Sequence, residues 1–468
     1  MYKEKIDAYI EAHKQEMIDD ICELCRINSE RMEPEDDMPY GPGPAECLDA
    51  ALDMAEGYEF ETQDYDGYVG VVDFSTELPS QLDILAHLDV VPAGEGWTVT
   101  EPFEPVVKDG KLYGRGTADD KGPAVAALYA MRAVKELGIP LKKNVRLILG
   151  TDEECGSSDI KHYYANEKEA PMTFSPDGQY PVVNIEKGRL PGKFSGAFEV
   201  SEALPRLVAI NAGTKINVVP GKAKAIVEGV ELAVLEEAAK TVTADTGVEF
   251  QFVCDGALCE IIAVGAGAHA STPTEGNNAL TALLVLLFAL PLAECPQLDC
   301  LKKAAALMPH GDMHGAALGV DMEDEVSGRI TVAFSMLTVT ADSLNGEFDS
   351  RVPVCGNEEN VLQVIKAKMG ENGLILHNDK MTPPHMVDGN SRFVKTLLNA
   401  YERYTGLKGE CLAIGGGTYV HDLKNGVAFG ASMPGTDNKM HGADEFAVIE
   451  ELVVSAKMFA QVIVDLCS

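Results

Sequence analysis

The sequence predicts an α/β protein in which a largely parallel sheet is covered by helices and a second domain interrupts the first. Two observations predict it. Strand-like and helix-like segments alternate over residues 1–186, whereas the character of the chain changes over residues 187–384. Five short clusters of acidic and histidine residues all lie outside that stretch, and the last of them is at His441. We therefore expect one domain built from residues 1–186 and 385–468, with residues 187–384 inserted into it.

The first domain begins with an expected amphipathic helix, from residue 1 to about residue 28, where apolar residues recur at helical spacing. Strand-like segments follow at residues 67–74 and 81–86, and another at residues 144–150. Between them we expect a helix from Pro123 to Gly138, because proline suits the first helical position and glycine suits a helix stop. This alternation is typical of a parallel sheet with helical connections.

The inserted stretch has its own strands and helices. Strand-like runs occupy residues 206–210, 225–230 and 330–339. Helices rich in alanine and leucine are expected at residues 233–243 and 279–290. We therefore expect a separate domain that mixes helices and strands.

Composition excludes several classes of partner. Lys and Arg number 38 against 74 Asp and Glu, which gives a formal net charge of −36. Such a charge repels nucleic acid and anionic membrane surfaces, so we expect neither as a partner.

No apolar stretch follows the first basic residues, and the longest apolar run, residues 279–293, contains Pro291. That run is shorter than the roughly 18–20 residues of a membrane span. The apolar run at residues 279–293 therefore predicts a buried helix.

The number of cysteines indicates the cellular compartment in which we expect the protein. Eleven cysteines is an odd number in a long chain without a visible secretory signal. We therefore expect a cytoplasmic protein whose thiols are free. The pair Cys22 and Cys25 lies inside the first expected helix without a second pair nearby, which favours a core role.

The first candidate for chemistry follows the strand at residues 81–86. His87 and Asp89 stand two residues apart, and on an extended segment such residues point to the same side. A metal-bound histidine needs an acceptor for its other ring nitrogen, so Asp89 could orient His87 as a ligand. The alternative is a solvated turn with an incidental histidine.

Two acidic pairs come next. Asp119 and Asp120 precede the expected helix at residue 123, where they could serve as a cap or could bridge two cations. Glu153 and Glu154 follow the strand at residues 144–150. They could be a solvated loop, or could supply one metal ligand and one base without a metal.

The last two candidates are Asp177, in a Pro-Asp-Gly turn, and His441, far along the chain. Together the clusters supply two imidazoles and several carboxylates, which is what two divalent cations sharing a water require. One carboxylate is left over as a base. This stoichiometry predicts a two-metal hydrolase.

Other motifs carry less weight. His310 and His314 have the spacing of a zinc-binding helix, but Gly311 and the missing glutamate favour a loop. No phosphate-binding loop, dinucleotide fingerprint or serine-nucleophile elbow is found in the sequence.

In their order and spacing these clusters resemble the M20 metallopeptidase family, most closely its PepV-like dipeptidase branch. The resembling segments are residues 86–92, 114–123, 150–156, 175–178, 216–220, 268–271, 351–353, 415–418 and 440–441. The resemblance implies a zinc-peptidase-type catalytic domain with a mixed, mostly parallel central sheet and an inserted α+β lid domain. It also implies a dipeptidase.

The resemblance implies a site for two divalent cations, with zinc expected and manganese or cobalt as alternatives. The implied ligands are His87 and Asp177 for one metal, Glu154 and His441 for the other, and Asp119 as the bridge. Glu153 would be the general base acting on a metal-bridging water, and Asp89 would support His87. The peptide bond between Asp119 and Asp120 would be cis.

The resemblance also assigns substrate contacts. His269 would stabilise the oxyanion of the substrate carbonyl, and Asn217 and Arg351 would hold its C-terminal carboxylate. Gly416 and Thr418 would line the binding wall. Because the insert is long enough to supply these groups itself, a monomer is expected.

Two departures from the family pattern stand out. Val420 and His421 follow the glycine run where relatives carry an arginine, and Asp444 stands where asparagine is expected. These two departures concern the substrate preference more than the chemistry of the reaction. The alternatives to a dipeptidase are an M20-type deacylase or desuccinylase of N-acyl amino acids, and a non-catalytic relative that binds metals or peptides.

Overall fold

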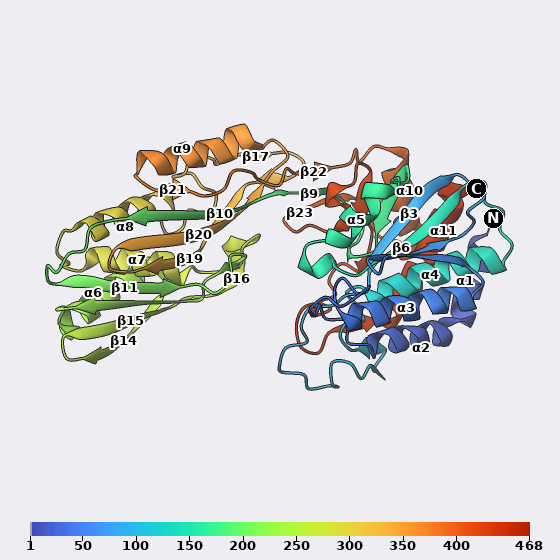
Figure 1. Ribbon diagram of the computed structural model, residues 1–468, viewed down its shortest axis with the longest axis horizontal. Coiled ribbons are helices and arrows are strands. Elements are labelled where there is room, and N and C mark those ends of the chain that lie inside the picture. Colours follow the sequence, from blue (N-terminus) through green and yellow to red (C-terminus); the bar gives the residue numbers. More distant parts are fainter. Residues whose placement is uncertain (1) are drawn as a thin grey trace. The chain divides into compact units, whose positions relative to one another are not determined.

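The computed structural model describes residues 2–468 and divides into two compact units (Figure 1). The first comprises residues 2–185, 386–412 and 417–468, and the second residues 186–385 and 413–416. The short segment Ala413–Gly416 thus groups with the second unit, although the sequence analysis assigned it to the first domain. The two units are described separately below.

The first unit is built on a nine-stranded sheet with the order β1-β2-β6-β3-β7-β24-β9-β22, in which β23 also pairs with β9. Its strands are β1 (Glu61–Tyr65), β2 (Val69–Asp73), β3 (Ser80–His87), β6 (Asn144–Gly150), β7 (Met172–Ser175), β9 (Val182–Glu186), β22 (His385–Met386), β23 (Cys411–Ile414) and β24 (Gly426–Ala428). β3 runs parallel to β6 and β7, and β24 runs parallel to β7. β2 pairs antiparallel with β1 and β6, and β24 with β9. The sheet is therefore mixed, with the expected parallel pairing confined to its centre.

Helices cover both faces of this sheet, as a parallel centre requires. Those of the first unit are α1 (Lys3–Ala12), α2 (Lys14–Cys25), α3 (Pro42–Gly57), α4 (Lys121–Glu136), α5 (Ser158–Asn166), α10 (Arg392–Thr405) and α11 (Ile449–Cys467). In Figure 1, α1 to α4 lie on one face and α5 lies on the other. Ile84 of β3 belongs to the large core under α4 and α11, whereas Leu85 packs with Ile160 and Tyr163 of α5.

The helix boundaries differ from the sequence prediction in two places. The expected first helix is two helices, α1 and α2, that meet at His13. α4 begins at Lys121, with Asp120 at its N-cap, so Pro123 is its third residue rather than its first. Gly138 has a φ of 61° just beyond the helix end, which confirms the predicted stop. Cys22 and Cys25 are buried in α2, which confirms their core role.

The second unit contains an eight-stranded sheet with the order β14-β15-β13-β11-β19-β20-β10-β21. Its strands are β10 (Gly188–Ala197), β11 (Arg206–Ala212), β13 (Lys222–Glu228), β14 (Glu249–Asp255), β15 (Leu258–Val264), β19 (Thr331–Val339), β20 (Ser343–Val352) and β21 (Ile375–Leu376). The neighbouring strands pair antiparallel. The helices are α6 (Leu232–Thr246), α7 (Ala279–Ala289), α8 (Pro296–Leu307) and α9 (Gln363–Glu371). α7 packs on β13, β15 and β19, and α8 packs on β10 and β20, so one sheet face forms the core of the unit.

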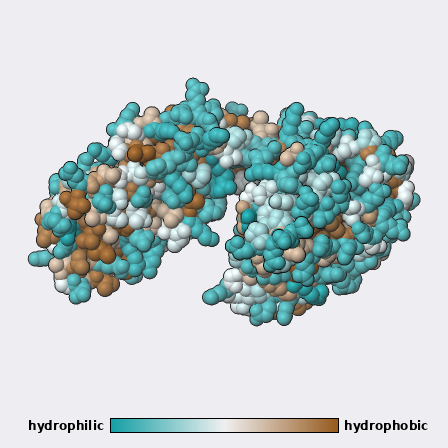
Figure 2. Space-filling model, in the orientation of Figure 1, coloured by the Kyte–Doolittle hydropathy of each residue, from teal (hydrophilic) through white to brown (hydrophobic). Residues whose placement is uncertain are grey.

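Short strands complete the structure. They are β4 (Val106–Lys108), β5 (Lys111–Tyr113) and β26 (Phe446–Val448) in one sheet, and the pairs β8 (Gly178–Gln179) with β25 (Ala431–Ser432), β12 (Val218–Val219) with β16 (Ala268–His269), and β17 (Glu323–Asp324) with β18 (Gly328–Arg329). No helix among residues 2–468 has the length and apolarity to cross a membrane. Figure 2 shows mostly hydrophilic side chains on the visible face, as expected from 74 acidic residues.

The expectation that all thiols are free is wrong for one pair. Cys254 and Cys259 face each other in the β14–β15 hairpin and form a disulfide, while the other nine cysteines are free. The register of the hairpin places the two side chains opposite each other. The expectation of free thiols followed only from the expected cytoplasmic location. His310 and His314 lie in a loop, as predicted, where their rings bond Thr281 Oγ1 and the Ile330 carbonyl.

Candidate metal centre

The centre of the first unit's sheet brings three of the predicted clusters to one edge. β6, β3 and β7 are neighbours and run parallel, so their carboxyl ends lie together. His87 is the last residue of β3, Glu153 and Glu154 begin the 3-10 turn Glu153–Cys155 after β6, and Asp177 follows β7. Asp119 reaches the same edge from the turn before α4.

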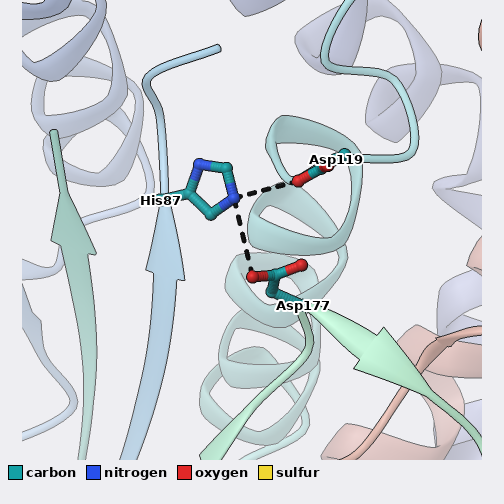
Figure 3. A group of neighbouring side chains, drawn as sticks. All are labelled: His87, Asp119 and Asp177. Carbon is teal, nitrogen blue, oxygen red and sulfur yellow. Dashed lines mark hydrogen bonds and ion pairs between the residues drawn. The ribbon is translucent and has the colours of Figure 1, made fainter. Parts of the chain in front are cut away.

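Five of the predicted side chains form two groups that share Asp119. In the first, His87 Nε2 lies 3.0 Å from Asp119 Oδ1 and 3.7 Å from Asp177 Oδ2 (Figure 3). In the second, His441 Nε2 lies 3.0 Å from Asp119 Oδ2 and 3.1 Å from Glu154 Oε1. The two carboxylate oxygens of Asp119 therefore face different groups.

These separations fit cation coordination. Ligand atoms about 2.0–2.2 Å from a tetrahedral zinc ion lie roughly 3.3 Å from one another. The four separations between ligand atoms, 3.0–3.7 Å, straddle that value. The mixture of imidazole and carboxylate donors suits zinc, and its oxygen content also suits manganese or cobalt. The donor set therefore fits two divalent cations bridged by Asp119, whose peptide bond to Asp120 is cis as the resemblance implies.

Asp89 does more than the sequence analysis assigned to it. The nearest acceptor for His87 Nδ1 is the main-chain carbonyl of Asp89, at 3.0 Å, while the Asp89 carboxylate lies 3.4 Å away. That carboxylate accepts the main-chain N–H groups of Glu153 and Glu154, each at 3.1 Å. Asp89 therefore fixes the His87 ring and also holds the turn that carries Glu153 and Glu154.

The crowded carboxylates perturb one another's protonation. Burial and the charge of Asp119 raise the pKa of Asp177 to about 7, and burial and Asp177 raise the pKa of Glu153 well above its usual range. Hydrogen bonds to Asp119 and Glu154 raise the pKa of His441 to about 10. Burial alone would raise the pKa of Asp119, but hydrogen bonds from both imidazoles lower it. Such repulsion among acids is what bound cations relieve.

A buried ion pair that the sequence analysis missed ties the ligand loops together. Arg115 Nη1 donates to Glu445 Oε2 over 2.6 Å, and both side chains are almost fully buried. Glu445 Oε1 accepts the N–H groups of Gly116, Ala118 and Asp119 at 3.0–3.3 Å. Arg115 lies in the motif that carries Asp119, and Glu445 follows His441 by four residues. However, they are 330 residues apart in the chain, and no local pattern pairs them.

A second missed contact joins Asp159 of α5 to Tyr419. The Tyr419 hydroxyl donates to Asp159 Oδ2, which also accepts the N–H groups of Thr151 and Asp152 at 2.7 and 2.9 Å. The pair packs so closely on Gly150 that a Cβ there would lie 2.0 Å from the Tyr419 oxygen. Asp159 thus supports the turn before Glu153.

The structure accounts for the unexpected acid at position 444. Asp444 Oδ1 accepts the N–H groups of Thr98 and Val99 at 2.8 and 2.9 Å, and Oδ2 accepts the Thr98 hydroxyl at 2.7 Å. Asp444 has a φ of 57° and His441 a φ of 62°, so the loop between them is strained for residues with side chains. The three bonds of Asp444 hold this loop in place.

We predict that Asp444→Asn is tolerated and that Asp444→Ala is not. The amide oxygen can accept both N–H groups, its nitrogen can donate to Thr98, and asparagine tolerates a positive φ. The alanine variant loses all three bonds, and we expect it to bind the metal at His441 about 10- to 100-fold more weakly. Equilibrium dialysis of both variants against zinc measures this. Equal affinities would contradict the role of Asp444.

The same contacts predict an acid sensitivity. Hydrogen bonds from the Thr98 hydroxyl and from the Thr98 and Val99 N–H groups lower the pKa of Asp444 from 3.8 to about 2. Its contribution to folding stability is therefore present above pH 3.8 and lost as the pH falls towards 2. Urea unfolding across that interval should show a smaller loss for Asp444→Asn than for the wild type.

The remaining predicted residues lie mainly in the second unit. Val218 of β12 pairs with His269 of β16, and the Ala270 N–H donates to the Asn217 carbonyl at 2.9 Å, so Asn217 and His269 are neighbours. Arg351 lies on β20. Gly416 belongs to the second unit and Thr418, the N-cap of a 3-10 turn, to the first.

Comparison with known proteins agrees with this fold. The model of "Peptidase family M20/M25/M40" matches residues 84–465. The Beta-Ala-Xaa dipeptidase of Lactobacillus delbrueckii subsp. lactis is 34% identical over 465 residues, which cover 97% of each chain. Among solved structures, human carnosine dipeptidase 1 superposes with a TM-score of 0.60 at 15% identity, over 99% of this chain and 98% of that one. The aminoacylhistidine dipeptidase of Vibrio alginolyticus gives 0.60 at 12% identity, over 96% of each chain.

A mixed sheet with candidate acid and imidazole ligands at the carboxyl ends of its parallel strands is the arrangement expected of a metal-dependent hydrolase. The extent of the family match is decisive for the assignment. The chain belongs to peptidase family M20/M25/M40 and is a hydrolytic metallopeptidase.

Proposed function

We propose that this protein is a dinuclear metal dipeptidase that uses Glu153 as its general base. The observation that carries the proposal is the pair of ligand groups that share Asp119, with Glu153 beside them but in neither group. The full-length relative named Beta-Ala-Xaa dipeptidase supports a dipeptide as the substrate. Zinc is the cation we propose, because imidazole and carboxylate donors both suit it.

In this mechanism His87, Asp119 and Asp177 would hold one cation, and Asp119, Glu154 and His441 would hold the other. Divalent cations bound there would supply Lewis acidity towards a water molecule and towards the substrate carbonyl. Glu153 takes the proton of the attacking water and later delivers it to the leaving amine. Asp89 keeps Glu153 in place through the Glu153 N–H.

His269 supplies the hydrogen-bond donor to the developing oxyanion. The Ser271 N–H, which can only donate, points at His269 Nδ1 over 3.2 Å, and Ser271 Oγ lies 2.6 Å from the same atom. Nδ1 is therefore an acceptor, which places the proton of a neutral ring on Nε2. Nε2–H is then the donor that the substrate oxygen needs.

Removing that donor should slow turnover. We expect His269→Ala to lower kcat by about 10²- to 10³-fold, the usual cost of losing one oxyanion donor. Metal content should not change, because no predicted metal ligand lies in the second unit. Steady-state kinetics with metal analysis measures both. Wild-type kcat in the variant would exclude His269 from the reaction.

We also propose that the chain acts as a monomer, because its own second unit carries His269, Asn217 and Arg351. Light scattering of the active enzyme would show a mass near 50.1 kDa. An active dimer that loses activity on dilution would argue against this.

A substrate panel tests the proposal as a whole. Dipeptides, tripeptides and N-acetyl amino acids are assayed with added Zn²⁺, Mn²⁺ or Co²⁺. We expect rapid cleavage of dipeptides and little of the other two classes. Cleavage confined to N-acetyl amino acids would instead support a deacylase, and binding without cleavage would support a non-catalytic relative.

A further inference from the structure

The two histidines of the candidate metal centre are held in different ways. Asp119 is shared by the His87 site, which also contains Asp177, and by the His441 site, which also contains Glu154. The side chain of His87 is 0% exposed, whereas that of His441 is 56% exposed. His87 is the last residue of the buried strand β3, while His441 lies in a loop. The position of the His441 ring therefore depends mainly on the main chain of its loop.

The backbone of that loop is strained. Lys439, His441 and Asp444 have φ values of 55°, 62° and 57°, in the left-handed region that residues other than glycine rarely adopt. Such conformations persist only where the surrounding contacts hold them. The three bonds of Asp444 to Thr98 and Val99 hold one end of the loop. A second support is needed beside His441 itself.

Arg115 supplies this second support. Its Nη2 donates to the carbonyl of Gly442, the residue after His441, over 3.2 Å, and to the carbonyl of Ala93 over 3.3 Å. Its Nη1 donates to Glu445 Oε2 over 2.6 Å. One guanidinium therefore holds the loop at two points, both directly after the exposed histidine.

The guanidinium of Arg115 is committed to these contacts. It is 1% exposed, and the ring of Trp97 lies over it at 5.5 Å. Its Nε has no hydrogen-bond partner within residues 2–468. A buried donor without a partner is destabilising, so the orientation of Arg115 is set by what Nη1 and Nη2 bind. Only the planar fork of an arginine reaches both points of the loop at once.

The His87 site has other supports. Within residues 2–468 the hydrogen bonds of Arg115 reach neither His87 nor Asp177. The His87 N–H donates to Asp120 Oδ2 over 3.2 Å, and the Asp177 N–H donates to Ser175 Oγ over 3.2 Å. Loss of the Arg115 contacts should therefore affect the two sites unequally.

We infer that Arg115 is a positioning residue for the His441 site alone, and that it orders the His441 loop before a cation binds there. The inference rests on the proposed two-metal centre. Groups that hold a metal ligand in place raise the metal affinity, because the ligand does not have to be ordered on binding. The exposed ring and the strained backbone of His441 make this support necessary at one site and not at the other.

Arg115→Lys tests the inference. Lysine keeps a positive charge for Glu445, but its one nitrogen cannot stand in for both Nη1 and Nη2, so the bond to Gly442 is lost. Metal-free protein is titrated with Co²⁺, followed by its visible absorption, and dialysed against Zn²⁺. The wild type should fill two sites. The variant should fill one site as the wild type does and bind the other cation about 10- to 100-fold more weakly.

A double variant identifies the ligand through which Arg115 acts. In the His441→Ala background, Arg115→Lys should cause no further loss of metal affinity, because two changes that act on one ligand are not additive. Glu445 also accepts the N–H of Asp119, which offers a different route to the metals. Additive losses would show that Arg115 acts through Asp119 and would overturn the assignment to the His441 site.

Arg146 provides a matched control in the same unit. Its Nε and Nη2 donate to the two carboxylate oxygens of Asp83 at 2.7 and 2.8 Å, and Nη2 also donates to the Lys168 carbonyl at 3.0 Å. Asp83 lies four residues before His87 on β3, or about 13 Å along the strand. Arg146→Lys should lower Tm as Arg115→Lys does and leave both metal affinities unchanged. An equal loss of metal in the two variants would reveal a general loosening of the fold and would overturn the inference.

Glu445→Gln is a second variant in case Arg115→Lys does not fold. The glutamine oxygen can still accept the N–H groups of Gly116 and Ala118, but its amide nitrogen cannot accept from Arg115. The affinity of the His441 site should again fall while that of the His87 site stays. Wild-type affinity at both sites would count against the inference in this variant too.

Two different failures can be told apart. If the folded variants bind both cations as the wild type does, the inference is wrong while the two-metal dipeptidase stands. If the wild type itself fills fewer than two sites, the proposed two-metal centre is wrong and the inference falls with it.

Discussion

Glu153→Gln is expected to lower kcat by about 10²- to 10⁴-fold, the range that general acid–base catalysis contributes. Glutamine keeps the size of the side chain but cannot take the proton of the attacking water. Because Glu153 belongs to neither ligand group, the variant should keep both metals. The change also leaves the main-chain bond from Glu153 to Asp89 intact. Kinetics on a dipeptide together with metal analysis measures the two effects separately.

The adjacent residue is the control. Glu154 Oε1 lies 3.1 Å from His441 Nε2, so Glu154→Gln should weaken metal binding as well as catalysis. Two neighbouring glutamates would then respond differently to the same substitution. Turnover close to that of the wild type in Glu153→Gln would assign the base elsewhere.

Asp119→Asn is expected to have the other large effect, on the metals themselves. Its Oδ1 and Oδ2 face different ligand groups, at 3.0 Å from His87 Nε2 and 3.0 Å from His441 Nε2. An amide offers one oxygen acceptor where the carboxylate offers two, and it lacks the negative charge. We expect the number of tightly bound metals to fall below two per chain and hydrolysis to be lost.

His441→Ala separates this bridging role from that of an ordinary ligand. His441 belongs to one group only, so its loss should weaken one metal and spare the one at His87 and Asp177. Titration of the metal-free variants with Co²⁺, followed by its visible absorption, counts the sites that fill. If Asp119→Asn filled both sites as the wild type does, Asp119 would not be a bridge.

Local patterns were sufficient to predict much of the first unit. The strands β3 and β6 and the stop of α4 at Gly138 follow from apolar runs and from glycine, which are local signals. The break between α1 and α2 at His13 has no glycine or proline to mark it. The antiparallel pairing of β2 with β6 depends on a contact between segments that are far apart in the sequence. The sequence therefore predicted the elements better than the edges of the sheet.

Parallel strands that end at a common edge explain why His87, Glu154 and Asp177 meet, whereas Asp119 and His441 were assigned to the site from the family resemblance. The contacts that hold them could not be predicted in this way. Arg115 and Glu445 are 330 residues apart, and Tyr419 and Asp159 are 260 apart. Each pair joins segments that meet only in the folded chain.

Two further contacts could have been predicted from the sequence. Arg351 Nε donates to Asp349 Oδ1 over 2.6 Å, and the two residues are two apart on a strand and therefore share a face, as His87 and Asp89 do. Gly256 is the first residue of the two-residue turn Gly256–Ala257, and glycine at that position is a hairpin signal that places Cys254 opposite Cys259.

The most direct test of the central claim is anomalous diffraction from crystals of the protein grown with zinc. We predict two peaks about 3.5–4 Å apart, as in other two-metal sites. One should lie among His87, Asp119 and Asp177, and the other among Asp119, Glu154 and His441. A single peak, or peaks that Asp119 does not contact, would contradict a two-metal centre bridged by Asp119.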